Sequence, residues 1–375
     1  MKDLKKTTES EGRLMSIDAL RGFDMLFIMG GAGLLAALAQ WMPCGFTESL
    51  ARQMDHVEWH GLAHHDTIFP LFLFIAGISF PFSLSKQRAM GRSEGAIHWK
   101  VVRRGLTLVL LGMIYNGLLD LDFSNFRYAS VLGRIGLAWM FGALIYMHTG
   151  WKSRCWITAA LLVSYWLLAG FIPAPDAEGA DIFSARGSIV GYVDRILLPG
   201  RIYYGDIDPE GILGTIPAIG TALLGMFAGE WVKSDREGLT PGKKSLGLLM
   251  AGVALLVIGL AWSTVFPINK KMWTSSFVMV VGAYSTLMFA LFYYLIDVKR
   301  WRRWTLFFTV IGMNSITIYL GQRFINFSYT SKGIFGGLIG LMPEASRYFF
   351  SQAAYITVCW LFLYFLYRKK VFLKV

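Results

Sequence analysis

Residues 55–79, DHVEWHGLAHHDTIFPLFLFIAGIS, join a dense cluster of titratable side chains to a long apolar run. The cluster holds four of the chain's six histidines and three acidic residues: His56, His60, His64, His65, Asp55, Glu58 and Asp66. The apolar run that follows has the composition of a membrane helix. Because charge is costly near lipid, an acid–base cluster at the mouth of such a helix indicates a functional site.

The composition of the whole chain predicts that this segment belongs to a membrane protein. The 375 residues are 55% hydrophobic and 16% charged, and the mean hydropathy is +0.50. Soluble domains carry about 25% charged residues. We therefore predict an all-α polytopic membrane protein with about ten transmembrane helices. The predicted helices cover residues 22–42, 67–85, 101–119, 130–147, 155–172, 211–232, 245–266, 274–296, 304–327 and 351–367.

Basic residues are distributed unevenly between the two sets of loops that these helices define. Most of them lie in the terminal segments and in the loops on the same side, within residues 2–21, 86–104, 152–154, 233–244, 299–303 and 368–374. The positive-inside rule makes this side cytoplasmic, so both termini are predicted to be cytoplasmic. The net charge of +12 is therefore a topology signal, and we expect no nucleic-acid partner.

The chain is predicted to form one domain, because no low-complexity linker divides it. Residues 1–375 are expected to form a single transmembrane domain with a cytoplasmic tail at 1–20 and an extracytoplasmic loop at 173–210. The same topology puts the histidine cluster and the loop FPINKKMW, residues 266–273, on the extracytoplasmic side. We expect the protein in the inner (cytoplasmic) membrane, surrounded by lipid bilayer, and a homodimer is left open.

The histidine cluster admits three interpretations. His56, His60 and His64 are spaced four apart, which would put them on one helix face and would suit zinc. Against zinc, Gly61 interrupts the helix and no cysteine ligand set accompanies the histidines. The histidines can also be solvated loop side chains. The third interpretation is a general base that Asp66 or Asp55 orients, because histidine titrates near neutral pH. We expect no metal at the cluster.

Polar side chains also fall inside or at the ends of the predicted helices: Asp24, Arg134, Glu210, Asn314 and Ser315. Such residues mark a ligand pathway, a site or an internal ion pair. Asp24 can pair with an arginine, and Glu210 can be a plain helix start, since acids favour that end of the helix dipole. Arg21 and Arg134 are candidates for holding a phosphate-bearing ligand, because arginine binds phosphate bidentately.

Several long and unusual blocks occur in a fixed order along nearly the whole chain: RLMSIDALRGFDM, HVEWHGLAHHDTIFPLFLFIAGIS, VLGRIG, GYVDRILL with DPEGILGT, FPINKKMWTSSFV, GMNSITIY and YRKKVFLKV. In this order they resemble the heparan-α-glucosaminide N-acetyltransferases and their bacterial relatives. The resemblance implies transfer of an acetyl group from cytosolic acetyl-CoA to the amine of a terminal glucosamine across the membrane. The implied partners are acetyl-CoA and an amino-sugar acceptor.

The resemblance also implies the catalytic histidine, which in this family lies in an H-x-x-W-x-G-L block ahead of an apolar F-P helix. That block is residues 56–62 here, so the role falls on His56. The chain departs from the animal member of the family at two places. His60 stands where that member has Asn, and the sequence MGGAGLL, residues 29–35, contains no Asn where that member has one.

We assign the remaining roles on this basis. Asp66 joins His56 as a catalytic residue, and Asn314, Ser276 or a backbone N–H would bind the developing oxyanion. The residues assigned to the acceptor are Trp59, His60, Glu210, Lys270 and Trp273. The residues assigned to acetyl-CoA are Arg21, Arg134, Ser276 and Ser315.

Two other functions remain open at this point. An amino-sugar transporter would also need polar groups inside helices and aromatic loops. An O-acyltransferase acting on a cell-envelope polysaccharide would use similar machinery and would leave a base-labile ester instead of an amide. The sequence also leaves open whether the acetyl group passes directly or through an acetyl-imidazole.

Overall fold

The computed structural model describes residues 14–373, and helices dominate this range. Its helices are α2 (Met15–Leu26), η1 (Phe27–Gly31), α3 (Ala32–Trp41), α4 (Gly45–Arg52), α5 (His64–Ala89), α6 (Glu94–Tyr115), η2 (Leu118–Asp120), α7 (Val131–His148), α8 (Trp151–Phe171), α9 (Ile189–Leu197), α10 (Thr215–Lys233), α11 (Pro241–Ser263), α12 (Ser275–Phe292), η3 (Tyr293–Val298), α13 (Thr305–Met313), α14 (Ser315–Phe324), α15 (Phe327–Gly340) and α16 (Glu344–Arg368). The only β-pairing within residues 14–373 is two isolated bridges, Arg127 with Gly200 and Pro173 with Ser188.

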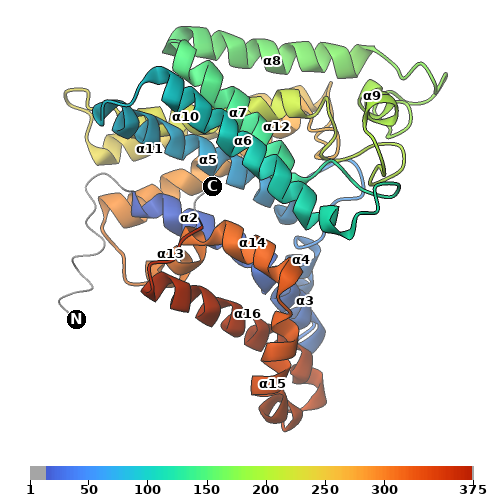
Figure 1. The fold of residues 1–375 in the computed structure, drawn as a ribbon, viewed down its shortest axis with the longest axis vertical. Helices are drawn as coiled ribbons and strands as arrows, with labels where there is room; N and C mark the ends of the chain where they lie inside the picture. Colours follow the sequence, from blue (N-terminus) through green and yellow to red (C-terminus); the bar gives the residue numbers. More distant parts are fainter. Residues whose placement is uncertain (1–13, 374–375) are drawn as a thin grey trace.

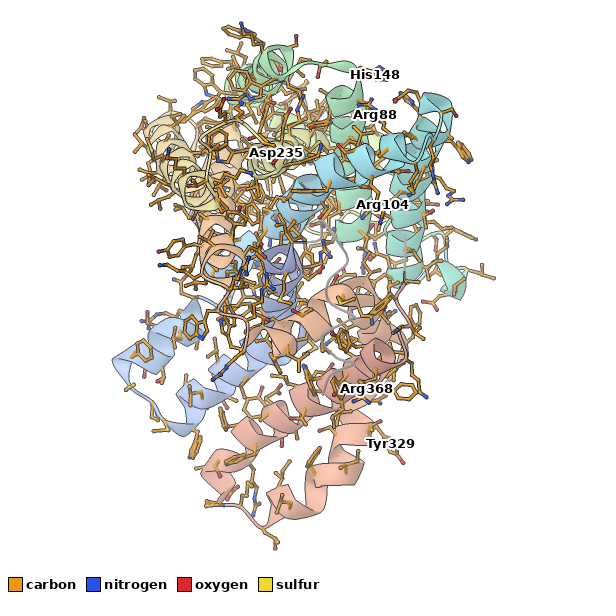
Figure 2. All side chains as sticks on the ribbon, turned by 90° about the vertical axis from the view of Figure 1, so that its left-hand side faces the viewer. Arg88, Arg104, His148, Asp235, Tyr329 and Arg368 are labelled. Carbon is orange, nitrogen blue, oxygen red and sulfur yellow. The ribbon has the colours of Figure 1, made fainter. Side chains whose placement is uncertain are left out.

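The helices form two adjoining groups (Figure 1). One group contains α5–α8 and α10–α12, and the other contains α2, α3 and α13–α16. The long helices run in alternating directions, so the loops that follow α5, α7, α10 and η3 gather at one end of the molecule. Seen from that end, Figure 2 shows Arg88, His148, Asp235 and Arg368 on its surface. The irregular segments before α5 and around α9 lie at the opposite end (Figure 1).

The prediction of an all-α polytopic membrane protein is confirmed. Eight helices within the described range are long and apolar enough to cross a membrane: Met15–Trp41, His64–Ala89, Val131–His148, Trp151–Phe171, Thr215–Lys233, Pro241–Ser263, Ser275–Val298 and Glu344–Arg368. The two other predicted segments, 101–119 and 304–327, correspond to α6 and to the pair α13–α14. Positions 1–13 of the predicted tail, with their basic residues, and Lys374 lie outside the described residues.

The first helix begins earlier than predicted and contains a local distortion. We predicted a start at residue 22, but α2 begins at Met15, so Asp18 and Arg21 lie inside it. Eight of its residues are buried, and packing against the rest of the bundle outweighs the cost of polar side chains in its first turns. The π-helical turn η1 contains Gly30 at φ 134°, a conformation that glycine adopts without steric cost. This turn separates α2 from α3 in a segment that we predicted as one helix.

The predicted helix 304–327 is interrupted at Asn314. This residue has φ −128° and ψ 31°, which ends α13 and allows α14 to begin at Ser315. The Asn314 side chain donates through Nδ2 to the carbonyl of Val371, 3.1 Å away, in the segment that follows α16. This hydrogen bond holds the segment that follows α16 beside the break between α13 and α14.

Helices α2 and α13 cross at two glycines. A Cβ atom on Gly22 would lie 1.8 Å from the carbonyl oxygen of Phe308, and one on Gly312 would lie 1.9 Å from the carbonyl oxygen of Asp18. Both neighbours are backbone atoms in helices, so neither can move aside alone. Close backbone approach through small residues is a common way for membrane helices to associate.

We expect Gly22→Ala to destabilise the protein, because the added methyl group forces the two helix backbones apart. Such overpacking costs about 1–3 kcal/mol. Gly95→Ala is the matched control, since nothing lies within 4 Å of a Cβ on Gly95 in α6 and alanine favours a helix by about 0.5–1 kcal/mol. Thermal unfolding in detergent should therefore shift down for the first variant and not for the second. A Gly22→Ala protein as stable as the wild type would contradict the close crossing.

Candidate active site

His56 and Asp66 form a hydrogen-bonded pair at the start of α5. The distance from His56 Nδ1 to Asp66 Oδ1 is 2.7 Å. Asp66 is in the first turn of the helix and is 1% exposed, and its Oδ2 accepts the backbone N–H groups of Ala63 and Val57 at 3.1 and 3.4 Å. A carboxylate is favoured at a helix N-terminus by the helix dipole. The carboxylate is therefore fixed in place before it meets the imidazole.

This geometry determines which nitrogen of His56 can act as a base. The Asp66 carboxylate is a pure acceptor, so Nδ1 carries the proton and donates it. Nε2 then carries the lone pair. The His56 side chain is 48% exposed, and it borders a cavity. The pair thus has the arrangement in which a carboxylate sets the tautomer of a histidine and stabilises its charged form.

Lys270 is the third charged side chain at this pair. Its Nζ lies 3.4 Å from Asp66 Oδ1 and 3.2 Å from His56 Nδ1. Because Nδ1 donates to Asp66, the contact of Lys270 with the ring is proximity and its ion pair is with the carboxylate. Burial lowers the pKa of the Lys270 ammonium, and the adjacent Asp66 opposes that shift. Asp66 therefore accepts the hydrogen bond from His56 and also neutralises the charge of Lys270.

The loop that carries Lys270 is held rigidly. The backbone N–H of Asn269 donates to Thr274 Oγ1, and the Asn269 side chain accepts the N–H of Met272 at 2.9 Å. The Gly61 N–H donates to the carbonyl of Ile268, which joins this loop to the histidine segment. Lys271 donates to the carbonyl of Glu58 and lies 4.2 Å from the ring centre of Tyr204. Two segments more than 200 residues apart thus form one side of the site.

These groups border the histidine cavity, a space of about 250 Å³. Its polar and aromatic lining residues are His56, Trp59, His65, Asp66, Phe69, Arg127, Tyr203, Tyr204, Glu210, Lys270, Lys271 and Tyr319. The indole of Trp59 is fixed by a 2.6 Å hydrogen bond to the carbonyl of Phe183. Aromatic rings beside fixed charges suit a sugar, whose apolar face packs on rings while its polar groups bind charges.

The turn Asp208–Gly211 places Glu210 at this cavity. Arg127 donates to both oxygens of Asp208, at 2.6 and 2.8 Å, and also to Glu210. Arg134 donates to the carbonyls of Pro209 and Gly211 at 2.5 and 2.6 Å. The Glu210 carboxylate is therefore paired with an arginine. It is not a helix start, because α10 begins only at Thr215 and not at the predicted residue 211.

Asp194 in α9 supports the same turn from behind. Its carboxylate accepts the N–H groups of Asp208 and Ile212, at 3.1 and 2.9 Å. Burial raises the pKa of this carboxyl to about 6. A Cβ on Gly211 would lie 2.0 Å from Asp194 Oδ2, so this position requires glycine.

A second space, the arginine cavity, lies next to the first and has a volume of about 270 Å³. Its polar lining residues are Arg21, Ser79, Arg104, Asn314, Ser315 and Tyr319. Arg21 lies 3.4 Å from Ser79 Oγ and 3.5 Å from Asp18. The guanidinium of Arg104 lies 4.4 Å from the ring centre of Trp139, and its buried Nε has no hydrogen-bond partner among residues 14–373. Leu373, after α16, also lines this cavity.

The two cavities have four lining residues in common. These are Ile28 of η1, Phe69 of α5, Val131 of α7 and Tyr319 of α14. We call this set the junction. Because the same side chains border both spaces, the cavities adjoin, with arginines in one and the His56–Asp66 pair in the other.

The structure brings some of the predicted residues to these cavities. His56, Trp59, Asp66, Glu210 and Lys270 line the histidine cavity. Arg21, Asn314 and Ser315 line the arginine cavity, so Asn314 lies apart from the His56–Asp66 pair.

Four other predicted residues line neither cavity. Arg134 is 2% exposed and its guanidinium is used by the Asp208–Gly211 turn. Ser276 is buried and contacts Thr274 Oγ1 at 3.1 Å. Trp273 is fully buried against Phe69 in the core. His60 lies outside the cavity lining, 3.4 Å from Asn269, and burial lowers its pKa.

Several cavity residues were not predicted from the sequence. Arg104, Lys271 and Arg127 were interpreted only as charges that set the topology, and Tyr203, Tyr204 and Tyr319 were not singled out. The adjacent tyrosines Tyr203 and Tyr204, separated by three residues from the DPEG turn, were an available signal. The signal for Arg104 was its position inside the apolar segment 101–119.

The apolar helices of membrane length define a multi-pass membrane protein. They surround two adjoining cavities, and the His56–Asp66 pair at one of them makes a site suited to group transfer. The chain belongs to the family described as heparan-alpha-glucosaminide N-acetyltransferase, catalytic, whose model matches residues 13–260. His56, Asp66, Arg104 and Glu210 lie within the matched residues.

Two curated relatives carry the same family name. The mouse heparan-alpha-glucosaminide N-acetyltransferase is 27% identical over 426 residues, covering 98% of this chain and 61% of the mouse protein. The human protein of that name is 26% identical over 423 residues, covering 97% of this chain and 60% of its own length. The chain thus spans about three fifths of the length of these relatives.

Proposed function

We propose that this protein is a transmembrane N-acetyltransferase that moves acetyl from acetyl-CoA to the amine of glucosamine or a terminal amino sugar. The observation that carries the proposal is the junction. Side chains that border the arginine-bearing space also border the space that contains His56 and Asp66. A donor lying in the first cavity can therefore present its acetyl end to an acceptor in the second.

The arginine cavity suits acetyl-CoA. The donor is anionic at its nucleotide end and carries its thioester on a long, thin arm. Arg21 and Arg104 supply cationic groups, and arginine is the side chain best suited to phosphate. The remaining lining is largely apolar, including Met25, Phe72 and Trp139. Since basic loops gather at one end of the bundle, we propose that this end is cytoplasmic, with the protein in the inner membrane.

The histidine cavity suits the acceptor. Trp59, Tyr203 and Tyr204 provide aromatic surfaces for a sugar ring, and Glu210 is a carboxylate of the lining that can attract its ammonium group. Nε2 of His56 is the group that can accept a proton there. An ammonium cannot attack a carbonyl, so a nearby base is required.

The proposed reaction balances as follows. The acceptor ammonium loses one proton, and its nitrogen lone pair attacks the thioester carbonyl carbon. The new C–N bond forms, the C–S bond breaks, and the second amine proton passes through His56 Nε2 to the departing sulfur. The products are the N-acetyl sugar, CoA thiol and one released proton. An acetyl-imidazole intermediate would use the same two cavities.

The test uses purified protein in liposomes with labelled acetyl-CoA and glucosamine on opposite sides. The expected result is a labelled amide that resists mild base. Label released by mild base would select the O-acyltransferase alternative. Movement of unmodified glucosamine without any requirement for acetyl-CoA would select the transporter alternative. Absence of any acetylated product would overturn the proposed function.

We expect Arg104→Gln to raise the KM for acetyl-CoA by about 10- to 100-fold. The reason is the loss of one hydrogen bond to a charged group, which is worth about 1.5–3 kcal/mol. The KM for glucosamine should not change, because Arg104 lines only the arginine cavity. Arg103→Gln is the matched control, since Arg103 is exposed and lines neither cavity. Equal KM values for the two variants would contradict the placement of the donor.

A further inference from the structure

Tyr319 is the polar member of the junction. Ile28, Phe69 and Val131 present hydrocarbon there, and they come from three different elements. The phenol of Tyr319 is therefore the only hydrogen-bonding side chain of the four. In the proposed function the thioester carbonyl has to reach the junction for the acceptor amine to attack it from the histidine cavity. The polar group at the junction is thus beside the reacting bond.

The position of the Tyr319 ring is set by its stacking neighbour and by the start of its own helix. It stacks on Tyr115, at the end of α6, with ring centres 4.6 Å apart and planes at 20°. Its own helix, α14, starts afresh after the break at Asn314, which separates its direction from that of α13. A phenol keeps its proton at neutral pH and can donate it in a hydrogen bond. A held donor needs no reorganisation when charge develops, which is the condition for electrostatic catalysis.

The other donors near the path are committed elsewhere or lie outside it. The Asn314 amide donates to Val371 and lines only the arginine cavity. Ser276 lines neither cavity. The ammonium of Lys270 is paired with Asp66. Tyr319 alone combines a donor with a position that borders both spaces.

We propose that the Tyr319 hydroxyl donates a hydrogen bond to the thioester carbonyl oxygen and stabilises the oxyanion of the tetrahedral intermediate. When the amine attacks, the C=O electron pair moves onto this oxygen and Tyr319 keeps its proton. When the intermediate collapses, the C=O bond reforms and the sulfur leaves with the proton delivered through His56. This role rests on the proposed acetyl transfer and adds a catalytic residue to it.

The test compares Tyr319→Phe with Tyr115→Phe in the liposome assay. Tyr319→Phe keeps the stacked ring and should lower kcat by about 100-fold, as expected for one oxyanion donor. Its Kd for acetyl-CoA, measured by calorimetry, should stay within about threefold, and its thermal stability should not change. Tyr115→Phe removes a hydroxyl that interacts with the Tyr319 hydroxyl but lines neither cavity, so kcat should fall by less than about tenfold.

Two results would overturn the role of Tyr319 and leave the proposed function standing. One is a Tyr319→Phe variant with wild-type kcat. The other is an equal loss of kcat in both variants, which would mean that the stacked pair acts only on structure. If the wild type itself forms no acetylated amine, the proposed function and the role of Tyr319 are both overturned.

Discussion

His56→Ala should lower kcat for acetyl transfer by about 10³- to 10⁴-fold, near the upper range for loss of a general base. Nε2 of His56 borders the cavity, and Nδ1 is held by Asp66 at 2.7 Å, so no other imidazole has the same support. His65 packs edge-on against His56, with ring centres 4.6 Å apart, but its Nδ1 has no hydrogen-bond partner among the described residues. Initial rates in the liposome assay measure the effect.

Added imidazole provides the positive control for this variant. The truncated side chain leaves room beside Asp66, so imidazole should restore part of the lost rate without changing the Kd for acetyl-CoA. His98→Ala provides the negative control, since His98 lies in α6 and lines neither cavity. A His56→Ala protein within tenfold of the wild-type rate would rule out His56 as the base.

Asp66→Asn should lower kcat by about 10³-fold. The carboxylate accepts the hydrogen bond from His56 Nδ1 and neutralises Lys270, 3.4 Å away. Losing a hydrogen bond to a charged group costs about 1.5–3 kcal/mol, and the unpaired Lys270 ammonium adds repulsion against the imidazolium that forms during transfer. The two effects act on the same proton transfer, so they multiply in rate.

A double variant separates this electrostatic effect from damage to α5, whose first turn Asp66 also caps. Asp66→Asn combined with Lys270→Met removes the unpaired ammonium and should recover about tenfold of the lost rate. Asp55→Asn is the matched control, because Asp55 is exposed beside His56 and lines neither cavity. If the double variant is no faster than Asp66→Asn, the role assigned to the Lys270 charge is wrong.

The parts of the site that follow from sequence are those in which local spacing determines contact. His56 and Asp66 are 10 residues apart, and a carboxylate in the first turn of a helix meets the loop that precedes that helix. The all-helical fold follows similarly from apolar runs of membrane length. The segment 208–211 was interpreted only as a possible helix start, so neither the turn that it forms nor the support of its backbone carbonyls by Arg134 was predicted.

The other parts of the site depend on which helices pack against one another in the folded protein. Arg104 and Tyr319 are far apart in sequence, and only the packing of α6 and α14 brings both into the lining of the arginine cavity. Asn314, in contrast, was singled out from the sequence. A polar residue inside an apolar segment suggested oxyanion binding, whereas in the structure it breaks a helix and holds Val371.

The hydrocarbon part of the junction also bears on the electrical integrity of the membrane. An enzyme that passes a group from one face to the other risks becoming an ion leak, because its two cavities adjoin. An ion passing between Ile28, Phe69 and Val131 would have to shed its hydration shell, and hydrophobic constrictions exclude ions by dewetting. A neutral acetyl group meets no such barrier. If the acyl end crosses here as proposed, the same three side chains would also resist the passage of hydrated ions.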